Sequence, residues 1–193
     1  MRARWVFDSR FSLPAYRSRP RKHTYLVQHY LGWEVEASTA AFDPQVATLF
    51  DLRTEQRGGL CFFYILPHDK QRALLEYTVF SHQPWPRAEY ERELRAYLEG
   101  TLSLSDYRMV GTEQGIIPMT DHPFRRRLGR RIMAIGTAGG MVKPSTGYAF
   151  ARIQRDSRAI VRSLLDPVRK RVIPQSLAGL QVNNYFRSLC FLS

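Results

Sequence analysis

The sequence has little cysteine and no long apolar run, and each shortage excludes a class of protein. Two cysteines, Cys61 and Cys190, are too few for a disulfide framework, and they form no metal-binding pattern with the scattered histidines. Every apolar run is shorter than the roughly 18 residues of a membrane-spanning helix. The first residues carry charge without an apolar segment, so we expect no signal peptide.

Glycine is absent from the start of the chain. The first one is Gly32, and the spacing G-x-G-x-x-G occurs nowhere. A Rossmann-type dinucleotide unit normally begins with a strand followed by that glycine turn. The sequence therefore predicts that no such unit lies at its beginning.

The composition is that of a soluble globular chain with a strong basic bias. Of 193 residues, 44% are hydrophobic and 24% are charged, which is enough to bury a core in one domain or in a piece of a larger one. The net charge is +12, but the basic residues fall in separate groups at 17–22, 125–131 and 152–171, without interleaved aromatics. We expect no nucleic-acid partner, and a solvated or membrane-facing basic surface instead.

Hydrophobic patterning predicts a mixed α/β (α+β) chain. Strands are expected at 24–35, 46–53, 60–67 and 72–81, and the short turns between the last three favour an antiparallel meander. A helix is expected at 87–99, between Pro86 and Gly100. Further strands are expected at 107–111, 115–119 and 132–135, and a second helix is expected to begin near Ser145.

Residues 131–152 (RIMAIGTAGGMVKPSTGYAFAR) have the most distinctive composition. Glycines at 136, 139 and 140 would let the backbone approach another group closely. The N–H groups of a following helix would suit a phosphate or an anionic ring oxygen. The alternative is a tight turn followed by an ordinary helix cap.

Six further motifs accompany this glycine segment in a fixed order. They are FDSR (7–10), QHYLGWEVE (28–36), FDPQVATLFDLR (42–53), FYILP (63–67), LLEYTVFS (74–81) and EQGIIPMTD (113–121). Together with residues 135–154, this set resembles the lycopene cyclase family of carotenoid biosynthesis, bacterial type, over roughly residues 5–160.

The resemblance implies part of an FAD-binding fold related to the flavin hydroxylases, with an antiparallel substrate-domain sheet. It implies an isomerase that closes the acyclic ψ ends of lycopene to β rings, supported by reduced FAD with NAD(P)H as reductant and without net redox change. The residues implied to contact FAD are Gly136, Thr137, Ala138, Gly139, Gly140, Met141, Pro144, Ser145, Thr146 and Gly147. We also expect a cytoplasmic protein in peripheral contact with a membrane surface.

The resemblance also suggests an organisation in three parts. Residues 1–124 would form the substrate-domain sheet and helix, 125–166 the carboxy-terminal FAD motif, and 167–193 a divergent tail. The family's amino-terminal ADP-binding unit is not in this sequence, so we expect a fragment.

Glu76 is the leading candidate for the acid. Ring closure needs a proton delivered in a dry site, and a carboxyl group among apolar neighbours stays protonated at neutral pH. The two-residue period of a strand puts Glu76 on one face with Leu74, Thr78 and Phe80. Glu76 also stands at the first glutamate of the family's FLEET-type motif, where Tyr77 replaces the second. The alternative is an exposed strand glutamate.

Asp51 is a second catalytic candidate, and its alternative is a salt bridge with Arg53 at a strand end. Asp8 and Arg10 are expected to form a local pair, and Cys61 an inert part of the core. Two other functions remain open: an FAD-dependent monooxygenase or dehydrogenase of the same fold, and a basic binding module for membranes or nucleic acid.

Overall fold

The computed structural model describes residues 3–12 and 23–165, which form two compact units. One unit is Leu26–Ile116. The other combines the described residues up to Tyr25 with those from Ile117 onward. The basic group at 17–22, Cys190 and the tail at 167–193 lie outside the described residues.

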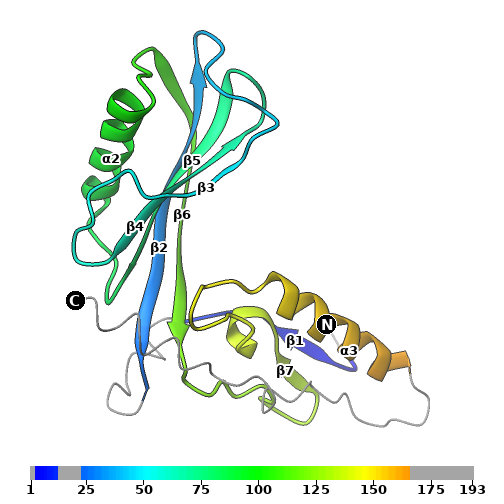
Figure 1. Cartoon of the computed structure of the whole chain (residues 1–193). Coiled ribbons are helices and arrows are strands. Elements are labelled where there is room, and N and C mark those ends of the chain that lie inside the picture. Colours follow the sequence, from blue (N-terminus) through cyan, green and yellow to red (C-terminus); the bar gives the residue numbers. More distant parts are fainter. Residues whose placement is uncertain (1–2, 13–22, 166–193) are drawn as a thin grey trace. The chain divides into compact units, whose positions relative to one another are not determined.

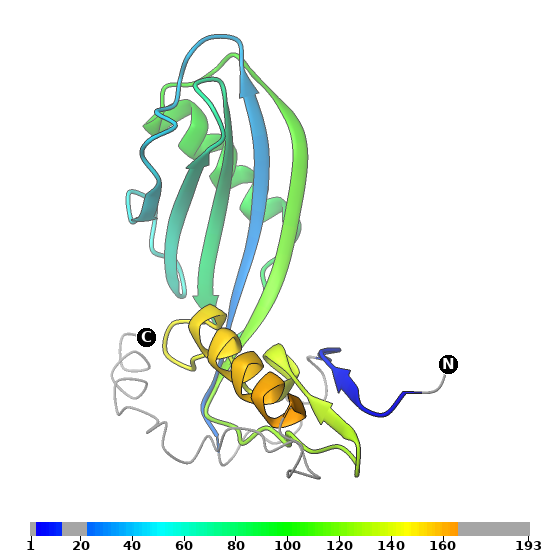
Figure 2. The same ribbon diagram turned by 90° about the vertical axis from the view of Figure 1, so that its right-hand side faces the viewer.

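A five-stranded sheet dominates the first unit, in the order β3-β4-β5-β2-β6 (Figures 1 and 2). The bounds of its strands are β2 (Tyr25–Ala37), β3 (Thr48–Asp51), β4 (Leu60–Pro67), β5 (Arg72–Ser81) and β6 (Tyr107–Thr120). The pairs β3–β4, β4–β5 and β2–β5 are antiparallel. The predicted fold class and meander are therefore confirmed.

The expected break between two strands at 107–111 and 115–119 is wrong, because β6 runs unbroken through both. Its glycines lie where side chains of β2 need room. A Cβ at Gly111 would come within 2.9 Å of the Glu34 carboxylate, and one at Gly115 within 2.4 Å of the Tyr30 hydroxyl oxygen. These glycines permit close packing of adjacent strands instead of ending a strand.

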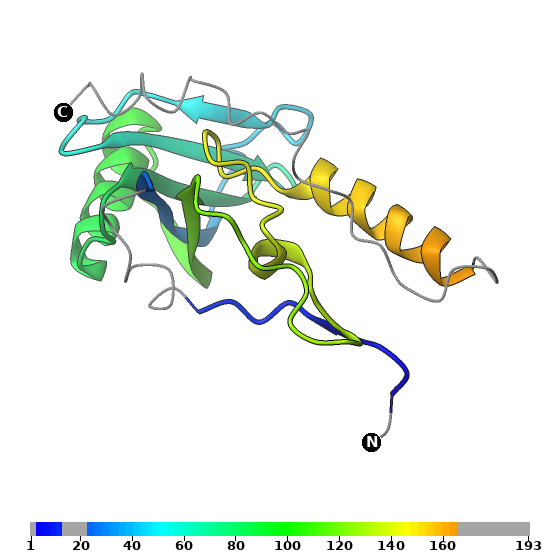
Figure 3. The same cartoon turned by 90° about the horizontal axis from the view of Figure 1, so that it is seen from below.

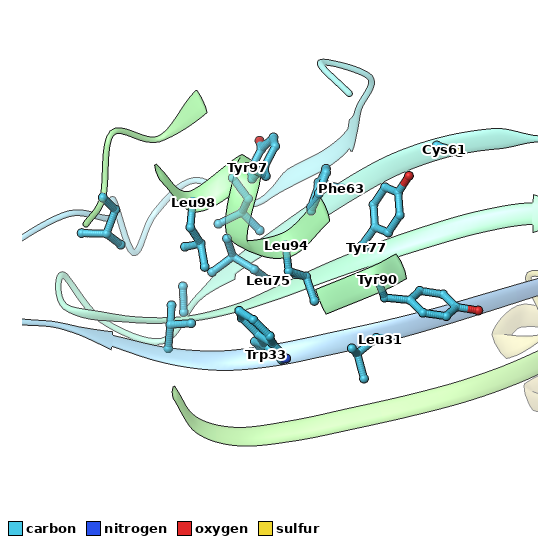
Figure 4. Packing of buried hydrophobic residues seen from close by; sticks show 14 of the residues in the cluster. Leu31, Trp33, Cys61, Phe63, Leu75, Tyr77, Tyr90, Leu94, Tyr97 and Leu98 are labelled. Atoms are coloured by element: carbon cyan, nitrogen blue, oxygen red, sulfur yellow. The ribbon is translucent and has the colours of Figure 1, made fainter. Parts of the chain in front are cut away.

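Helix α2 (Arg87–Ala96) and the π-helical turn η1 (Tyr97–Thr101) cover one face of this sheet. Tyr97 stacks on Phe63 of β4 with ring centroids 3.8 Å apart, and Leu94 is fully buried (Figure 4). From β5, the alternate residues Ala73, Leu75, Tyr77 and Val79 belong to this core. The other alternate set of β5 therefore points to the opposite face of the sheet.

A buried chain of hydrogen bonds fixes the loop between β5 and α2. Tyr90 bonds to Nδ1 of His29 (2.7 Å), and His29 Nε2 bonds to Ser81 Oγ (2.8 Å), which itself donates to the Gln83 carbonyl. Since Ser81 donates to Gln83, His29 must donate from Nε2 and accept at Nδ1. Burial lowers the pKa of His29 to about 4, so it is a neutral structural residue.

The second unit is built on a parallel pair of strands, β1 (Val6–Asp8) and β7 (Ile132–Ala134), together with helix α3 (Phe150–Leu165). Helix α3 is the yellow-to-orange coil in Figure 3. The sequence pattern indicates no strand at β1, because three residues are too few to show a period. Its Phe7 packs with Met133 and Ile160 in a small core.

Helix α3 begins at Phe150, and the predicted start near Ser145 is wrong. The intervening residues close a separate turn. Lys143 donates its N–H to the Tyr148 carbonyl, and Gly147 donates back to the Lys143 carbonyl (both 2.9 Å). Gly147 has a φ of 72°, which a helix does not accommodate.

A buried ion pair joins helix α3 to the segment before β7. Arg126 donates from both terminal nitrogens to the two carboxylate oxygens of Asp156, at 2.8 and 2.7 Å. Both side chains are at least 90% buried. A bidentate pair of this kind fixes direction as well as distance.

We predict that Asp156→Asn destabilises the protein by about 3–5 kcal/mol, because it leaves a buried guanidinium without its counter-charge. Urea denaturation followed by circular dichroism measures the loss. Asp106→Asn, at an exposed aspartate, is the control. Equal stability of the two variants would contradict a structural role for the ion pair.

Candidate functional site

The face of the sheet opposite α2 carries a cluster of aromatic rings. Cross-strand partners share a face, so β4 contributes Phe62 and Tyr64 beside Thr78 and Glu76 of β5. Phe62 contacts the rings of Phe50, Tyr64 and Phe80 at centroid distances of 4.9, 5.2 and 5.4 Å. We call this surface, the side of the sheet opposite α2, the open face, although Phe62 and Thr78 within it are fully buried.

Glu76 lies on the open face with Leu74, Thr78 and Phe80, as the strand period predicted. The hydroxyl of Thr78 donates to Glu76 Oε1 at 2.5 Å. Burial raises the pKa of Glu76 from 4.5 to about 7; the bond from Thr78 lowers the pKa, and the nearby Glu113 raises it. A substantial share of Glu76 is therefore protonated at neutral pH, as a general acid requires.

A second carboxyl group reaches Glu76 from two strands away. Gly32 of β2 is the direct cross-strand partner of Glu76. A Cβ at Gly32 would come within 2.9 Å of Cγ and 3.3 Å of Oε1 of Glu113. The Glu113 side chain thus passes over the glycine that pairs with Glu76, close enough for Glu113 to raise the pKa of Glu76.

Tyr77, at the second position of the family motif, faces away from Glu76. It belongs to the core under α2 and its ring lies 4.7 Å from that of Phe63. A carboxylate at position 77 would therefore be buried under the helix. The carboxyl group that lies nearest to Glu76 across Gly32 is that of Glu113 instead.

Asp51 lies in a different environment, on the α2 side of the sheet. Its cross-strand partner is Phe63, and it accepts hydrogen bonds from Tyr97 (2.5 Å) and from Arg53 (2.6 Å). The bond from Arg53 is the main cause that lowers the pKa of Asp51 well below its usual value. The carboxylate stays ionised at neutral pH and is a poor proton donor, so the salt-bridge alternative describes it better.

The other polar residues singled out in the sequence have structural surroundings. Asp8 and Arg10 form the predicted pair at 2.8 Å, and Cys61 is a free, fully buried cysteine. Within residues 3–12 and 23–165, no group of three His, Cys, Asp or Glu side chains could hold a metal ion. In the same residues, no helix is long and apolar enough to cross a membrane.

The glycine segment is partly self-contained. Residues 136–139 form a 3₁₀ turn, η2, after β7. A Cβ at Gly139 would lie 2.7 Å from the Ala134 carbonyl oxygen, so that glycine is required by the chain itself. Gly136 differs, because its φ is 59° and no atom lies within 4 Å of the position a Cβ would take. The backbone there is open to another molecule.

The ten residues implied to contact FAD fall into two groups. The side chains of Ala138 and Met141 are buried within the second unit, and the backbones of Gly139, Gly140 and Gly147 are buried too. The remaining five are half-buried: Gly136, Thr137, Pro144, Ser145 and Thr146. A ligand would have these five within reach.

Sequence reasoning missed Glu113 as a site residue, although its motif was noted. The available signal was the run Gly111-Thr112-Glu113-Gln114-Gly115, which places a glutamate between two glycines on one face of a strand. Glycines in a strand interior indicate close approach by neighbouring groups. The partner Gly32 could not be assigned without the strand register.

A family model described as "Lycopene cyclase protein" matches residues 1–189. The chain belongs to the lycopene cyclase family. The resemblance found in the sequence motifs is thereby confirmed, since the matched residues cover nearly the whole chain.

Curated members and relatives show how far the similarity extends. The chain is 32% identical over 146 residues to a chloroplastic neoxanthin synthase of Solanum lycopersicum, covering 69% of this chain and 28% of that protein. It is 36% identical over 110 residues to the chloroplastic lycopene beta cyclase of Arabidopsis thaliana, covering 55% and 22%. The chain thus spans less than a third of the length of these relatives.

A solved structure supports the fold. A geranylgeranyl bacteriochlorophyll reductase-like protein of Thermoplasma acidophilum superimposes with a TM-score of 0.52 at 15% identity, covering 71% of this chain and 33% of that one. At that identity the likeness concerns the fold alone.

We predict that Glu76 makes the protein less stable as the pH rises from about 4.5 to 7. The folded state holds the Glu76 proton up to a pKa of about 7, whereas the unfolded chain releases it near 4.5. The stabilisation that the Glu76 proton gives to the folded state is complete below pH 4.5 and is lost as the pH passes 7. His29 has the opposite effect between pH 4 and 6.5, since its pKa is lowered.

The comparison that isolates Glu76 is the urea midpoint of wild type minus that of Glu76→Gln at each pH. The difference should change between pH 4.5 and 7 and be constant outside that window. Exposed Glu99→Gln should give a flat difference. A flat difference for Glu76→Gln would show that burial does not raise its pKa.

Proposed function

We propose that the protein is a carotenoid cyclase that closes the acyclic ψ ends of lycopene to β rings without net redox change. The observation that carries the proposal is a buried carboxyl group, Glu76, whose pKa burial raises to about 7, on an aromatic sheet face of a chain in the lycopene cyclase family. The relatives include a lycopene beta cyclase, and this reaction needs an acid in a dry site.

The open face supplies what proton-initiated ring closure requires. Glu76 would give its proton to the terminal double bond, and an inner double bond would then close the ring on the carbocation. The positive charge moves to a ring carbon and is lost when a proton leaves. The faces of Phe62, Tyr64 and Phe80 would stabilise such a cation through their π-electrons.

We include FAD in the proposal, held by the half-buried residues of the glycine segment. The open backbone at Gly136 fits a group that must approach closely, and the first N–H groups of η2 have no partner within that turn. When bound, reduced FAD would supply an electron-rich ring that stabilises positive charge, with NAD(P)H as its source of electrons.

Contact with a membrane surface also belongs to the proposal. Lycopene is a long hydrocarbon that partitions into bilayers, and the +12 net charge of the chain favours anionic lipid surfaces. A peripheral, cytoplasmic position would give the open face access to its substrate.

We predict that Glu76→Gln lowers the cyclisation rate at least about a hundredfold, within the ~10²–10⁴-fold range of general acid catalysis. Glutamine keeps the shape and the bond from Thr78 but has no acidic proton. The assay is the conversion of lycopene by the protein expressed from its complete gene, with reduced FAD present and with products separated by chromatography.

Glu76→Asp should keep part of the activity, and Asp51→Asn should cyclise lycopene far faster than Glu76→Gln. Substrate and product must have equal mass without oxygen consumption. An oxygenated or desaturated product would instead favour an FAD-dependent monooxygenase or dehydrogenase. Near wild-type cyclisation by Glu76→Gln would remove Glu76 as the acid.

For the cofactor, we predict that Thr137→Glu weakens FAD binding by at least about tenfold, because it adds a negative charge at the start of η2, where an anionic group is expected. Flavin absorbance of the purified protein and an FAD titration measure the effect. Ser105→Glu makes the same charge change at an exposed residue of the other unit. Unchanged FAD affinity in Thr137→Glu would place the flavin elsewhere.

A further inference from the structure

The proposed reaction leaves two questions about protons that Glu76 alone does not answer. One proton enters at the terminal double bond, and one proton leaves the new ring carbon. A base must accept the second proton, and something must keep the first on Glu76 until the substrate is bound. A second carboxyl group at the same place would serve both needs.

Four strands align a single row of residues across the open face. From β6 to β4 the row is Glu113, Gly32, Glu76 and Tyr64, as the cross-strand partners and the contact over Gly32 show. Adjacent strands lie about 4.8 Å apart, so Glu113 and Glu76 are separated by two strand spacings at their backbones. Only a residue without a side chain at position 32 lets the two carboxyl groups meet.

The contact implies a shared proton. Two ionised carboxylates repel at hydrogen-bonding distance, whereas a carboxyl group and a carboxylate attract through one strong hydrogen bond. The groups that surround Glu76 are Tyr30 from β2, Tyr64 from β4, Thr78 from β5 and Glu113 from β6. Burial and the charges of both glutamates raise the pKa of Tyr30, so Tyr30 lies near both of them and brings no positive charge to the pair.

We propose that Glu76 and Glu113 act as a pair that holds one proton, with Glu113 as the positioning residue that keeps this proton on Glu76. This inference rests on the proposed cyclase function. Glu76 gives the proton to the terminal double bond and becomes a carboxylate beside the Glu113 carboxylate. The pair then carries two negative charges next to the carbocation, in a site of low dielectric.

The proton count closes over one turnover. The doubly charged pair stabilises the cation electrostatically, and the Glu113 carboxylate raises the proton affinity of Glu76, which makes Glu76 a stronger base. It takes up the proton that the ring carbon loses. The pair ends with one proton, as it began, and no oxidant or reductant is consumed.

Three variants test the pair in the complete protein. Glu113→Gln removes the charge. Gly32→Ala keeps both glutamates but introduces a Cβ that displaces the Glu113 side chain. Gly111→Ala is the matched control, because its Cβ would displace the Glu34 carboxylate instead.

Two readouts are needed. The first is the pH dependence of lycopene cyclisation. The second is the pH at which the effect of the Glu76→Gln substitution on the urea midpoint is halfway through its change, which we call the unfolding midpoint and which does not depend on activity. Glu113→Gln should slow cyclisation at pH 7 by at least about tenfold, a part of the ~10²–10⁴-fold total of acid–base catalysis. It should also move the alkaline limb of the rate profile and the unfolding midpoint to lower pH. Gly32→Ala should move both in the same direction, and Gly111→Ala should move neither.

The outcomes separate the inference from the proposed function. If the wild type does not cyclise lycopene, the function fails, and the unfolding midpoint still decides whether Glu113 acts on Glu76. A shifted midpoint with an unchanged rate overturns the catalytic part of the inference. An unchanged midpoint in Glu113→Gln overturns the pair itself.

Discussion

A buried carboxyl group with a raised pKa, on a sheet face that carries a cluster of aromatic rings, is the feature on which the proposed chemistry of this protein depends. Burial is the main force that keeps the proton on Glu76, with its pKa raised to about 7. Phe62 and the three rings around it form an aromatic surface on the same face. The opposite face carries the core under α2.

One face of the sheet forms the core and the other carries the candidate site, and this difference follows from the two-residue period of the strands. On β5, one alternate set packs under the helix, and the other carries Glu76 and Thr78. Asp51 illustrates the contrast, because it lies on the helix side and Arg53 holds it ionised. Two acidic residues on strands separated by β4 thus differ in how readily they hold a proton at neutral pH, and only Glu76 suits proton donation.

The sequence predicted those parts of the fold that depend on local pattern. The antiparallel strands, the first helix and the face of Glu76 all follow from periods of two or 3.6 residues, and the ordered motifs identified the family. Strand β1 was missed because three residues carry no period. The start of α3 was misplaced because Ser145 looks like a helix cap, whereas Gly147 closes a separate turn. Glu113 was missed as a site residue because its contact with Glu76 depends on strand register, which no local pattern contains.

The central claim is that burial raises the pKa of Glu76 to about 7, and a direct titration tests it most plainly. Carbon-13 NMR of glutamate-labelled protein would follow the side-chain carboxyl resonances from pH 4 to 9, with Glu76→Gln used to assign the signal. The structure predicts a Glu76 resonance that titrates with a midpoint near 7. A midpoint near 4.5, like that of an exposed glutamate, would contradict the account.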